Sequence, residues 1–218
     1  MRYVMATHVL VIYYSLHGHV EALANSVAAG ADSVRNTEVR LRRVPDAGDA
    51  RPIEREVDEA THDDVRWADA IAWGTPTRYG IMATPLKRFF DGMVDLWLRG
   101  DLEDKPTGVF TSSASIHGGQ ESTILTTLIP LLHFGMIFVG TPYAQNPQIL
   151  TTEAVGGSPY GPSTIAGPDD KHAVAAVELQ TARNLGIRLA RVASALKIVR
   201  VTTTQRQVDA PAYVTRGE

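Results

Sequence analysis

An apolar run at residues 9–14 leads directly into a short polar loop, and this junction most limits how the chain can fold. The run is nearly continuous, which is typical of a parallel strand buried on both faces. After the loop, apolar residues repeat with helical spacing at positions 20, 23, 24 and 27. The order of strand, glycine-containing turn and helix predicts an α/β protein with a loop at the start of its first helix.

The loop itself, Ser15-Leu16-His17-Gly18-His19, suits an anion. A helix that begins there directs unpaired N–H groups and the positive end of its dipole into the loop, a favourable place for a phosphate. Ser15 adds a hydroxyl donor, the two histidines add imidazole donors, and Gly18 permits close backbone approach. The alternative, in which Ser15 only caps the helix and the histidines are solvated, stays open here. A metal site is disfavoured, because the histidines lie in a turn and the chain has no cysteine.

Strand and helix patterns alternate along the rest of the chain. Strands are predicted at residues 8–14, 39–42, 68–74, 107–111 and 136–139, and helices at 20–31, 84–97, about 124–134 and 172–197. This alternation predicts a doubly wound, five-stranded parallel sheet in an α/β/α arrangement, with a long insertion at 141–170 after the fifth strand. One domain is expected over residues 1–197, followed by a flexible tail at 198–218.

Composition excludes several classes of protein. The 218 residues are 44% hydrophobic, as expected of a globular domain. A net charge of −3 and a pI of about 6.2 give no footprint for nucleic acid. The absence of cysteine suits a reducing cytoplasm and excludes disulfides. No apolar run approaches the ~18 residues of a membrane span, so a cytoplasmic protein without a membrane segment is expected.

Three small, polar, glycine-bearing loops follow predicted strands, at residues 15–19, 75–81 and 112–120. Ligands of doubly wound sheets bind outside the carboxyl ends of the strands, so these loops are expected to form one composite site. The chain contains neither G-x-x-x-x-G-K-[ST] nor G-x-G-x-x-G, which leaves a mononucleotide. Pro76, Arg78 and Tyr79 suit the edge of a planar ligand, and together the loops favour a flavin mononucleotide. Taken alone, the second loop is also compatible with a plain proline turn.

At this point the motifs resemble a known family. They are Tyr13–His19, Gly74–Gly80, His117–Glu121, Gly156–Gly161 and Thr164–Gly167. In this order, over roughly residues 8–197, they look like the WrbA family of flavodoxin-like FMN proteins, which act as NAD(P)H:quinone oxidoreductases. A simple flavodoxin would lack the insertion that carries the last two motifs.

The resemblance implies that all three loops contact FMN. The residues that would hold the phosphate are Ser15, Leu16, His17, Gly18, His19 and Val20. Those that would line the ring edge are Pro76, Thr77, Arg78, Tyr79, Gly80 and Ile81. Those that would surround the ribityl chain and ring are Ser113, Ala114, Ser115, Ile116, His117, Gly118 and Gly119. Trp97 resembles the family's tryptophan over the open flavin face and is expected to reach a neighbouring subunit's site. The resemblance further implies NADH or NADPH as co-substrate, a quinone as acceptor and a homotetramer.

The chain departs from the family at several positions. His17 stands where the family often has a tyrosine linked to the nicotinamide cofactor, so the preference between NADH and NADPH stays open. Ile81 replaces a frequent asparagine, and Ile116-His117 replaces smaller residues. The family's histidine near Gly135 aligns with Phe134, while His133 lies one place earlier. His133 is therefore expected either to contact FMN or to belong to the core.

These features predict a two-electron, ping-pong reduction of quinones, in which the flavin carries the chemistry. Trp97, Tyr79 and His17 are expected to shape the acceptor pocket, and His17 is a possible proton donor, although no indispensable acid or base is assigned. Three alternatives stay open: a flavodoxin-like single-electron carrier, a regulatory or binding protein with a vestigial flavin site, and an FMN reductase that acts on metals or azo dyes.

Overall fold

The computed structural model describes residues 6–45 and 56–203 of the protein, with side chains through residue 197. At its centre lies a sheet with the strand order β2-β1-β3-β5-β6. These strands are β1 (Thr7–Tyr13), β2 (Thr37–Arg43), β3 (Ala70–Arg78), β5 (Pro106–Ser113) and β6 (Ile137–Phe138). Every neighbouring pair in this order is parallel, which confirms the predicted five-stranded, doubly wound sheet.

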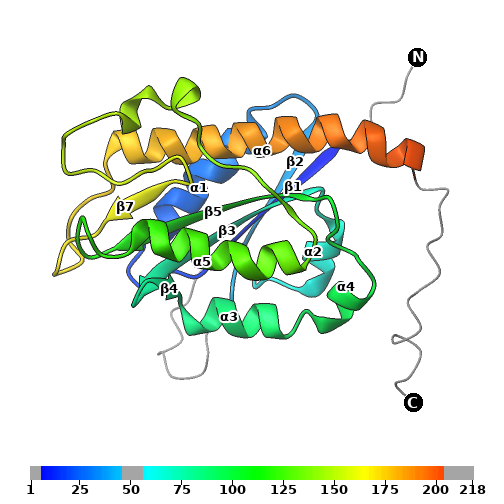
Figure 1. The fold of residues 1–218 in the computed structure, drawn as a ribbon, viewed down its shortest axis with the longest axis horizontal. Coiled ribbons are helices and arrows are strands. Elements are labelled where there is room, and N and C mark those ends of the chain that lie inside the picture. Colours follow the sequence, from blue (N-terminus) through cyan, green and yellow to red (C-terminus); the bar gives the residue numbers. More distant parts are fainter. Residues whose placement is uncertain (1–5, 46–55, 204–218) are drawn as a thin grey trace.

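Helices cover both faces of the sheet (Figure 1). One face packs on α1 (His19–Asp32) and α6 (Ala176–Thr203); the other packs on α2 (His62–Trp67), α3 (Thr84–Asp91), α4 (Val94–Leu98) and α5 (Gln120–His133). Within β1, Val11 and Tyr13 belong to the core beneath α1 and α6, whereas Leu10 and Ile12 belong to the opposite core. Burial on both faces is why this strand is apolar from Val9 to Tyr13.

The insertion shares the sheet edge with β6. That short strand pairs only with the beginning of β5, at Pro106 and Thr107. The chain then passes through two 3-10 turns, η1 (Tyr143–Gln145) and η2 (Pro147–Ile149), and returns as β7 (Ser163–Ile165). Strand β7 is parallel to the end of β5, with Thr111 opposite Ser163. The insertion follows the fifth strand as predicted, but β7 was not predicted, because a three-residue strand has too few positions to show a period.

The main differences from the sequence prediction concern β3, the helix predicted at 84–97 and the end of α6. Strand β3 continues to Arg78 and folds back into β4 (Ile81–Met82), so most of the predicted second loop is a β-hairpin. The predicted helix at 84–97 is divided into α3 and α4 around Gly92, and Ala83 rather than Thr84 is the N-cap. Helix α6 runs past residue 197 to Thr203; residues 204–218 lie outside the described part. No helix in the described ranges is both long and apolar enough to cross a membrane.

Helices α1 and α6 cross at two glycines. A Cβ at Gly30 would overlap the carbonyl oxygen of Arg183, and a Cβ at Gly186 would overlap that of Val27. The two backbones are therefore in direct contact, which places α1 firmly against the sheet and fixes where its N-terminus points.

We expect Gly30→Ala to lower the free energy of unfolding by about 2 kcal/mol, because the added methyl group separates the helices and overpacking costs about 1–3 kcal/mol. Helix propensity alone predicts the opposite sign, a gain of ~1 kcal/mol. Urea denaturation of the variant checks this, with the exposed Asn25→Ala on α1 as the control, expected to be neutral or slightly stabilising. An unchanged or raised stability of Gly30→Ala would contradict the close contact.

Candidate functional site

The turn between β1 and α1 is built around Gly18. This residue is the N-cap of α1 and has a φ of 91°, which is accessible at low cost only to glycine. Its N–H donates to Oγ of the buried Ser15 over 3.1 Å, so Ser15 closes the turn rather than capping the helix. A Cβ at Gly18 would meet no atom within 4 Å, so the space in front of the turn is open. The N–H groups at the start of α1 point toward that space.

The two histidines of this turn have different environments. Nε2 of the buried His19 lies 2.9 Å from the carbonyl oxygen of His172, so this ring nitrogen carries the proton and the side chain is a structural tie. What His19 offers an anion is its backbone N–H. His17 is half exposed, and its Nε2 lies 3.4 Å from Oδ2 of Asp170. No group of three or more metal-ligating side chains occurs among the described residues.

The hairpin between β3 and β4 forms the second part of the site. Tyr79 and Gly80 have φ angles of 54° and 81°, as in a two-residue type I′ turn. The N–H of Gly80 donates to Oγ1 of Thr77 over 3.2 Å, and Oγ1 of Thr123 on α5 donates to the same oxygen over 2.7 Å. The hairpin is therefore tied to α5, while the Tyr79 side chain at its tip is fully exposed.

The third loop is held by Gln120 and Ser113. Nε2 of Gln120 donates to Oγ of Ser113 over 2.9 Å, and Oγ of Ser113 donates to the carbonyl of Ser115 over 2.7 Å. On its other side Gln120 accepts a hydrogen bond from Ser163 of β7. Gly119 begins α5 with a φ of 91°, and a Cβ there would lie 3.0 Å from Cα of Gly80. The third loop is thus packed against both the hairpin and the insertion.

The three predicted loops meet around one cavity of about 150 Å³, which we call the edge cavity. Its predicted lining residues are Ser15, Leu16, His17, His19, Val20, Pro76, Thr77, Arg78, Ser113 and Ala114. Ser112 of the third predicted loop also lines it, and so do Ala166 and Asp170, which lie outside the three predicted loops. The last two follow β7, and their place beside the first loop depends on a strand that was not predicted. In the sequence, only the glycine-bearing stretch at 156–167 indicated that the insertion contributes to the site.

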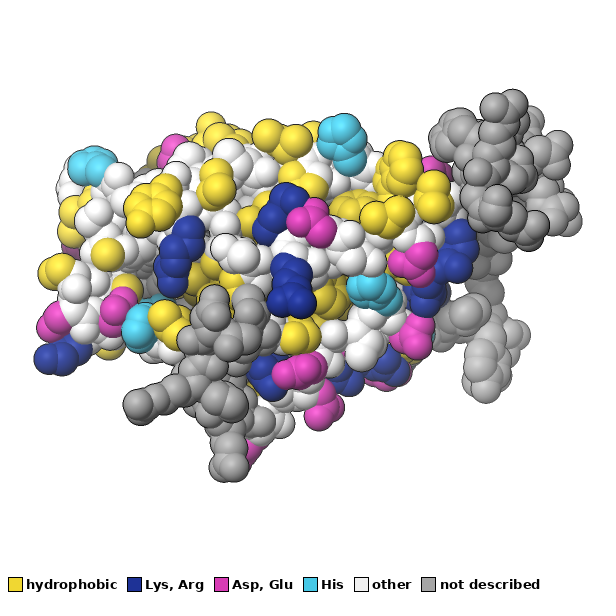
Figure 2. Space-filling view, turned by 90° about the horizontal axis from the view of Figure 1, so that it is seen from below, with side chains coloured by type: hydrophobic (Ala, Val, Ile, Leu, Met, Phe, Trp, Pro, Cys, Tyr) yellow, Lys and Arg dark blue, Asp and Glu magenta, His cyan; other side chains and the backbone are white. Residues whose placement is uncertain are grey.

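Trp97, Ile81 and His133 lie elsewhere on the single chain. They line an apolar groove of about 850 Å³ between α3, α4 and α5, and none of residues 15–20 lines it. Nε1 of Trp97 donates to the carbonyl of His133 over 3.0 Å. The face that carries α3 and α4 shows hydrophobic side chains close to basic and acidic ones (Figure 2). His133 is exposed, so its assignment to the core is wrong; contact with FMN stays a prediction.

Charges hold the short helix α4 in place. Oδ2 of Asp95 accepts from Nη2 of Arg66 and from Nη2 of Arg99, each over 2.6 Å, and Nδ1 of His62 lies 3.7 Å from Oδ1. Partial desolvation alone would raise the pKa of Asp95, but the two guanidinium groups outweigh it and hold this pKa below its ordinary value. Asp95 is therefore charged at neutral pH, and the network fixes the helix that carries Trp97.

Residues 7–149 match the family described as NADPH-dependent FMN reductase. The chain belongs to this family. Curated relatives named NAD(P)H dehydrogenase (quinone) are 43% identical over 199 residues in Geotalea uraniireducens and 46% identical over 195 residues in Cupriavidus metallidurans; each match covers 86% of this chain and 98% of the relative. They confirm the resemblance on which the sequence analysis relied.

Solved structures agree with membership of this FMN reductase family. A WrbA-like flavodoxin from Agrobacterium tumefaciens matches with a TM-score of 0.66 and 25% identity, covering 87% of this chain and 99% of that one. An archaeal flavodoxin matches with a TM-score of 0.57 at 20% identity, which supports the fold alone. The flavodoxin-like fold is thereby confirmed.

Asp170 is an unusual residue to line a cavity expected to bind an anion, because its side chain is a carboxylate. Its backbone is also strained, with a φ of 56° in the left-handed region. We expect Asp170→Asn and Asp170→Gly each to tighten FMN binding about fivefold at low salt, since a negative charge near the phosphate is removed. Asp170→Gly also relieves the backbone strain. Fluorescence titration with FMN at two salt concentrations checks both variants, and the gain should shrink at high salt. Weaker binding would instead mean that Asp170 serves the phosphate by orienting His17.

Proposed function

We propose that this protein is an FMN-dependent NAD(P)H:quinone oxidoreductase. The observation that carries the proposal is the edge cavity, where three glycine-bearing loops and the N-terminus of α1 meet at the carboxyl end of the sheet. The names of the relatives, NAD(P)H dehydrogenase (quinone), supply the substrate classes. The family description supplies the flavin.

The residues present fit FMN. Its phosphate is assigned to the turn at 15–18 and the first N–H groups of α1, where the open space before Gly18 gives room for an anion without a lysine. The flavin ring is assigned to the space between the hairpin at 77–81 and the third loop at 113–119, whose backbones are in contact at Gly80 and Gly119. When bound, FMN supplies a ring that accepts a hydride and passes two electrons to a quinone.

The protein's own contribution is placement and water exclusion. Nicotinamide and quinone are proposed to use the same open face in turn, which gives ping-pong kinetics. Tyr79 stands fully exposed at the hairpin tip, where a stacked substrate can cover it. His17, half exposed and lining the edge cavity, is the imidazole proposed to donate a proton through Nε2. The hydrogen bond from Thr123 to Thr77 fixes the position of the hairpin relative to α5.

The assembly belongs to the same proposal. Val94, Trp97 and Ile129 around the apolar groove are 58%, 47% and 57% exposed, an unusual concentration for a surface that faces water. We infer that a second copy covers this groove and that Trp97 thereby reaches the flavin site of its neighbour in a homotetramer. A cytoplasmic location stays a prediction from the sequence.

We expect FMN to bind stoichiometrically to the apoprotein, NADPH or NADH to bleach it under anaerobic conditions, and benzoquinone to restore the colour. Flavin fluorescence and absorbance in one cuvette measure all three steps. Binding with no bleaching would favour a single-electron carrier, and no binding would favour a regulatory protein with a vestigial site. Bleaching without transfer to benzoquinone would redirect the search to metals and azo dyes as acceptors.

We expect Ile129→Glu to reduce the assembly to smaller species, because a carboxylate in a covered apolar groove would be buried without a partner. Size-exclusion chromatography with light scattering measures the change. Val177→Glu, an exposed apolar position on α6 far from the groove residues in the fold, is the matched control and should leave the mass unchanged. A monomeric unaltered protein would refute the assembly without touching the proposed FMN site.

A further inference from the structure

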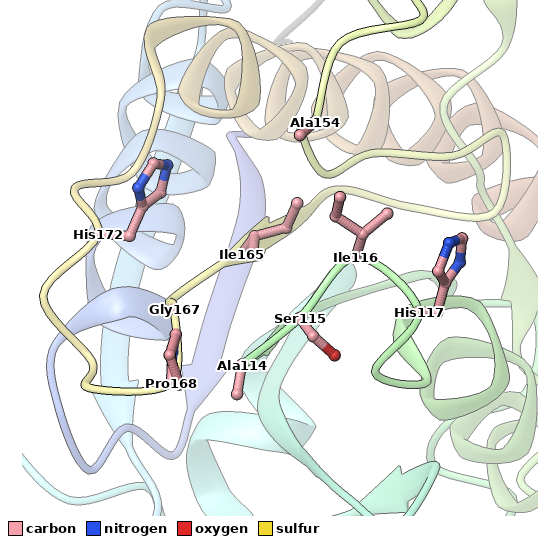
Figure 3. A pocket seen from close by; sticks show the side chains of 9 residues that line it. All are labelled: Ala114, Ser115, Ile116, His117, Ala154, Ile165, Gly167, Pro168 and His172. Carbon is pink, nitrogen blue, oxygen red and sulfur yellow. The ribbon is translucent and has the colours of Figure 1, made fainter.

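A second hollow adjoins the edge cavity and is lined by neither the first loop nor the β3–β4 hairpin. It has a volume of about 440 Å³ and lies between the third loop and the segment that follows β7 (Figure 3). This volume falls within the range of about 300–1,000 Å³ that small-molecule sites occupy. We call it the side hollow; its lining residues are Ala114, Ser115, Ile116, His117, Ala154, Ile165, Gly167, Pro168 and His172.

The side hollow and the edge cavity share their walls. Ala114 lines both, and residues after β7 alternate between them: Ala166 and Asp170 face the edge cavity, while Ile165 and Gly167 face the side hollow. Of the first loop, the residues that line the edge cavity do not line the side hollow; they are Ser15, Leu16, His17, His19 and Val20. A molecule that reacts beside the flavin can therefore extend into the side hollow without displacing the FMN phosphate.

The chemistry of the lining is apolar in the centre and polar at both ends. Ile116, Ile165 and Ala154 come together from three segments, while His117 and His172 stand at opposite sides (Figure 3). Ile116 is 51% exposed, a site where a flat apolar group can bury surface. Both imidazoles are exposed, and neither ring has a hydrogen-bond or ion-pair partner among the described residues. They are available as donors to phosphate or ribose oxygens.

We propose that the side hollow binds the adenosine half of the nicotinamide dinucleotide, with the adenine against Ile116 and Ile165 and the phosphates or ribose near His117 and His172. This inference rests on the proposed function, which requires a dinucleotide whose nicotinamide reaches the flavin. An apolar quinone tail would also fit the centre, but it would leave both imidazoles facing hydrocarbon. A nucleotide suits both the apolar centre and the two polar ends.

The test uses the full-length protein and a cavity-filling variant. Ala154→Trp fills the side hollow from an exposed position of the insertion that is not among the FMN residues. Thr152→Trp is the matched control, because it adds the same side chain to the same loop but lines a different depression. Binding of ADP-ribose, measured by calorimetry, needs no turnover; we expect binding to the unaltered protein and to Thr152→Trp, and at least a tenfold loss in Ala154→Trp.

Kinetics with FMN-loaded enzyme give a second readout. We expect Ala154→Trp to raise KM for NADPH and NADH about tenfold, a change equivalent to ~1.4 kcal/mol. The KM for reduced nicotinamide mononucleotide, which lacks the adenosine half, should stay within about twofold of its original value. An equal rise for the mononucleotide, an effect on the quinone KM alone, or no change in any KM would each overturn the proposal. If ADP-ribose binds but no nicotinamide is oxidised, the proposed function fails while the site stands.

His172 provides a finer test, because its side chain can be changed while its backbone still binds Ala166 and His19. We expect His172→Ala to weaken ADP-ribose binding about threefold to tenfold and His172→Gln, which keeps a donor, to recover part of the loss. Unchanged affinity in both variants would remove His172 from the site.

Discussion

The register between β1, β3 and β5 is the constraint on which the site depends. Gly74 of β3 lies opposite Tyr13 of β1 and Phe110 of β5. A Cβ at Gly74 would overlap the Phe110 ring and come within 2.9 Å of Cβ of Tyr13. The two aromatic side chains therefore occupy the space that a glycine leaves, which favours this one register. It brings the carboxyl ends of all three strands to the same edge of the sheet, where the three loops meet.

The sequence was informative where burial repeats over many residues. The apolar run of β1 is buried on both faces of the sheet, and the apolar stripes of α1, α5 and α6 each pack on one face. These elements could therefore be located within a few positions. The end of β3 could not be located in this way. Oγ1 of Thr75 accepts the N–H of Ala83, and a hairpin stabilised by such a polar bond leaves no apolar pattern in the sequence.

The candidate site was predictable to the extent that it is local. The turn at 15–18 and the two other loops carry their own glycines, so their roles follow from nearby residues. The partners of the two histidines do not follow from nearby residues. His19 binds the carbonyl of His172, 153 positions away, and His17 lies beside Asp170, which is equally far along the sequence. Trp97 and His133 are likewise joined only because α4 and α5 flank one groove. Long-range contacts of this kind produce no characteristic residue spacing from which they could be predicted.

One buried carboxylate explains how the insertion can serve as a wall of both cavities. Glu178, 2% exposed at the start of α6, accepts the N–H of Gly156 over 2.7 Å and the hydroxyl of Thr164 over 2.7 Å, and its second oxygen also accepts the N–H of Ala175 over 2.8 Å. Three charge-assisted donors and the positive end of a helix offset the cost of burying the charge. They join Gly156 and Thr164 of the insertion to α6, which packs directly on α1 at Gly30 and Gly186. A long loop anchored in this way can hold ligand-binding residues at the sheet edge with the precision of a strand.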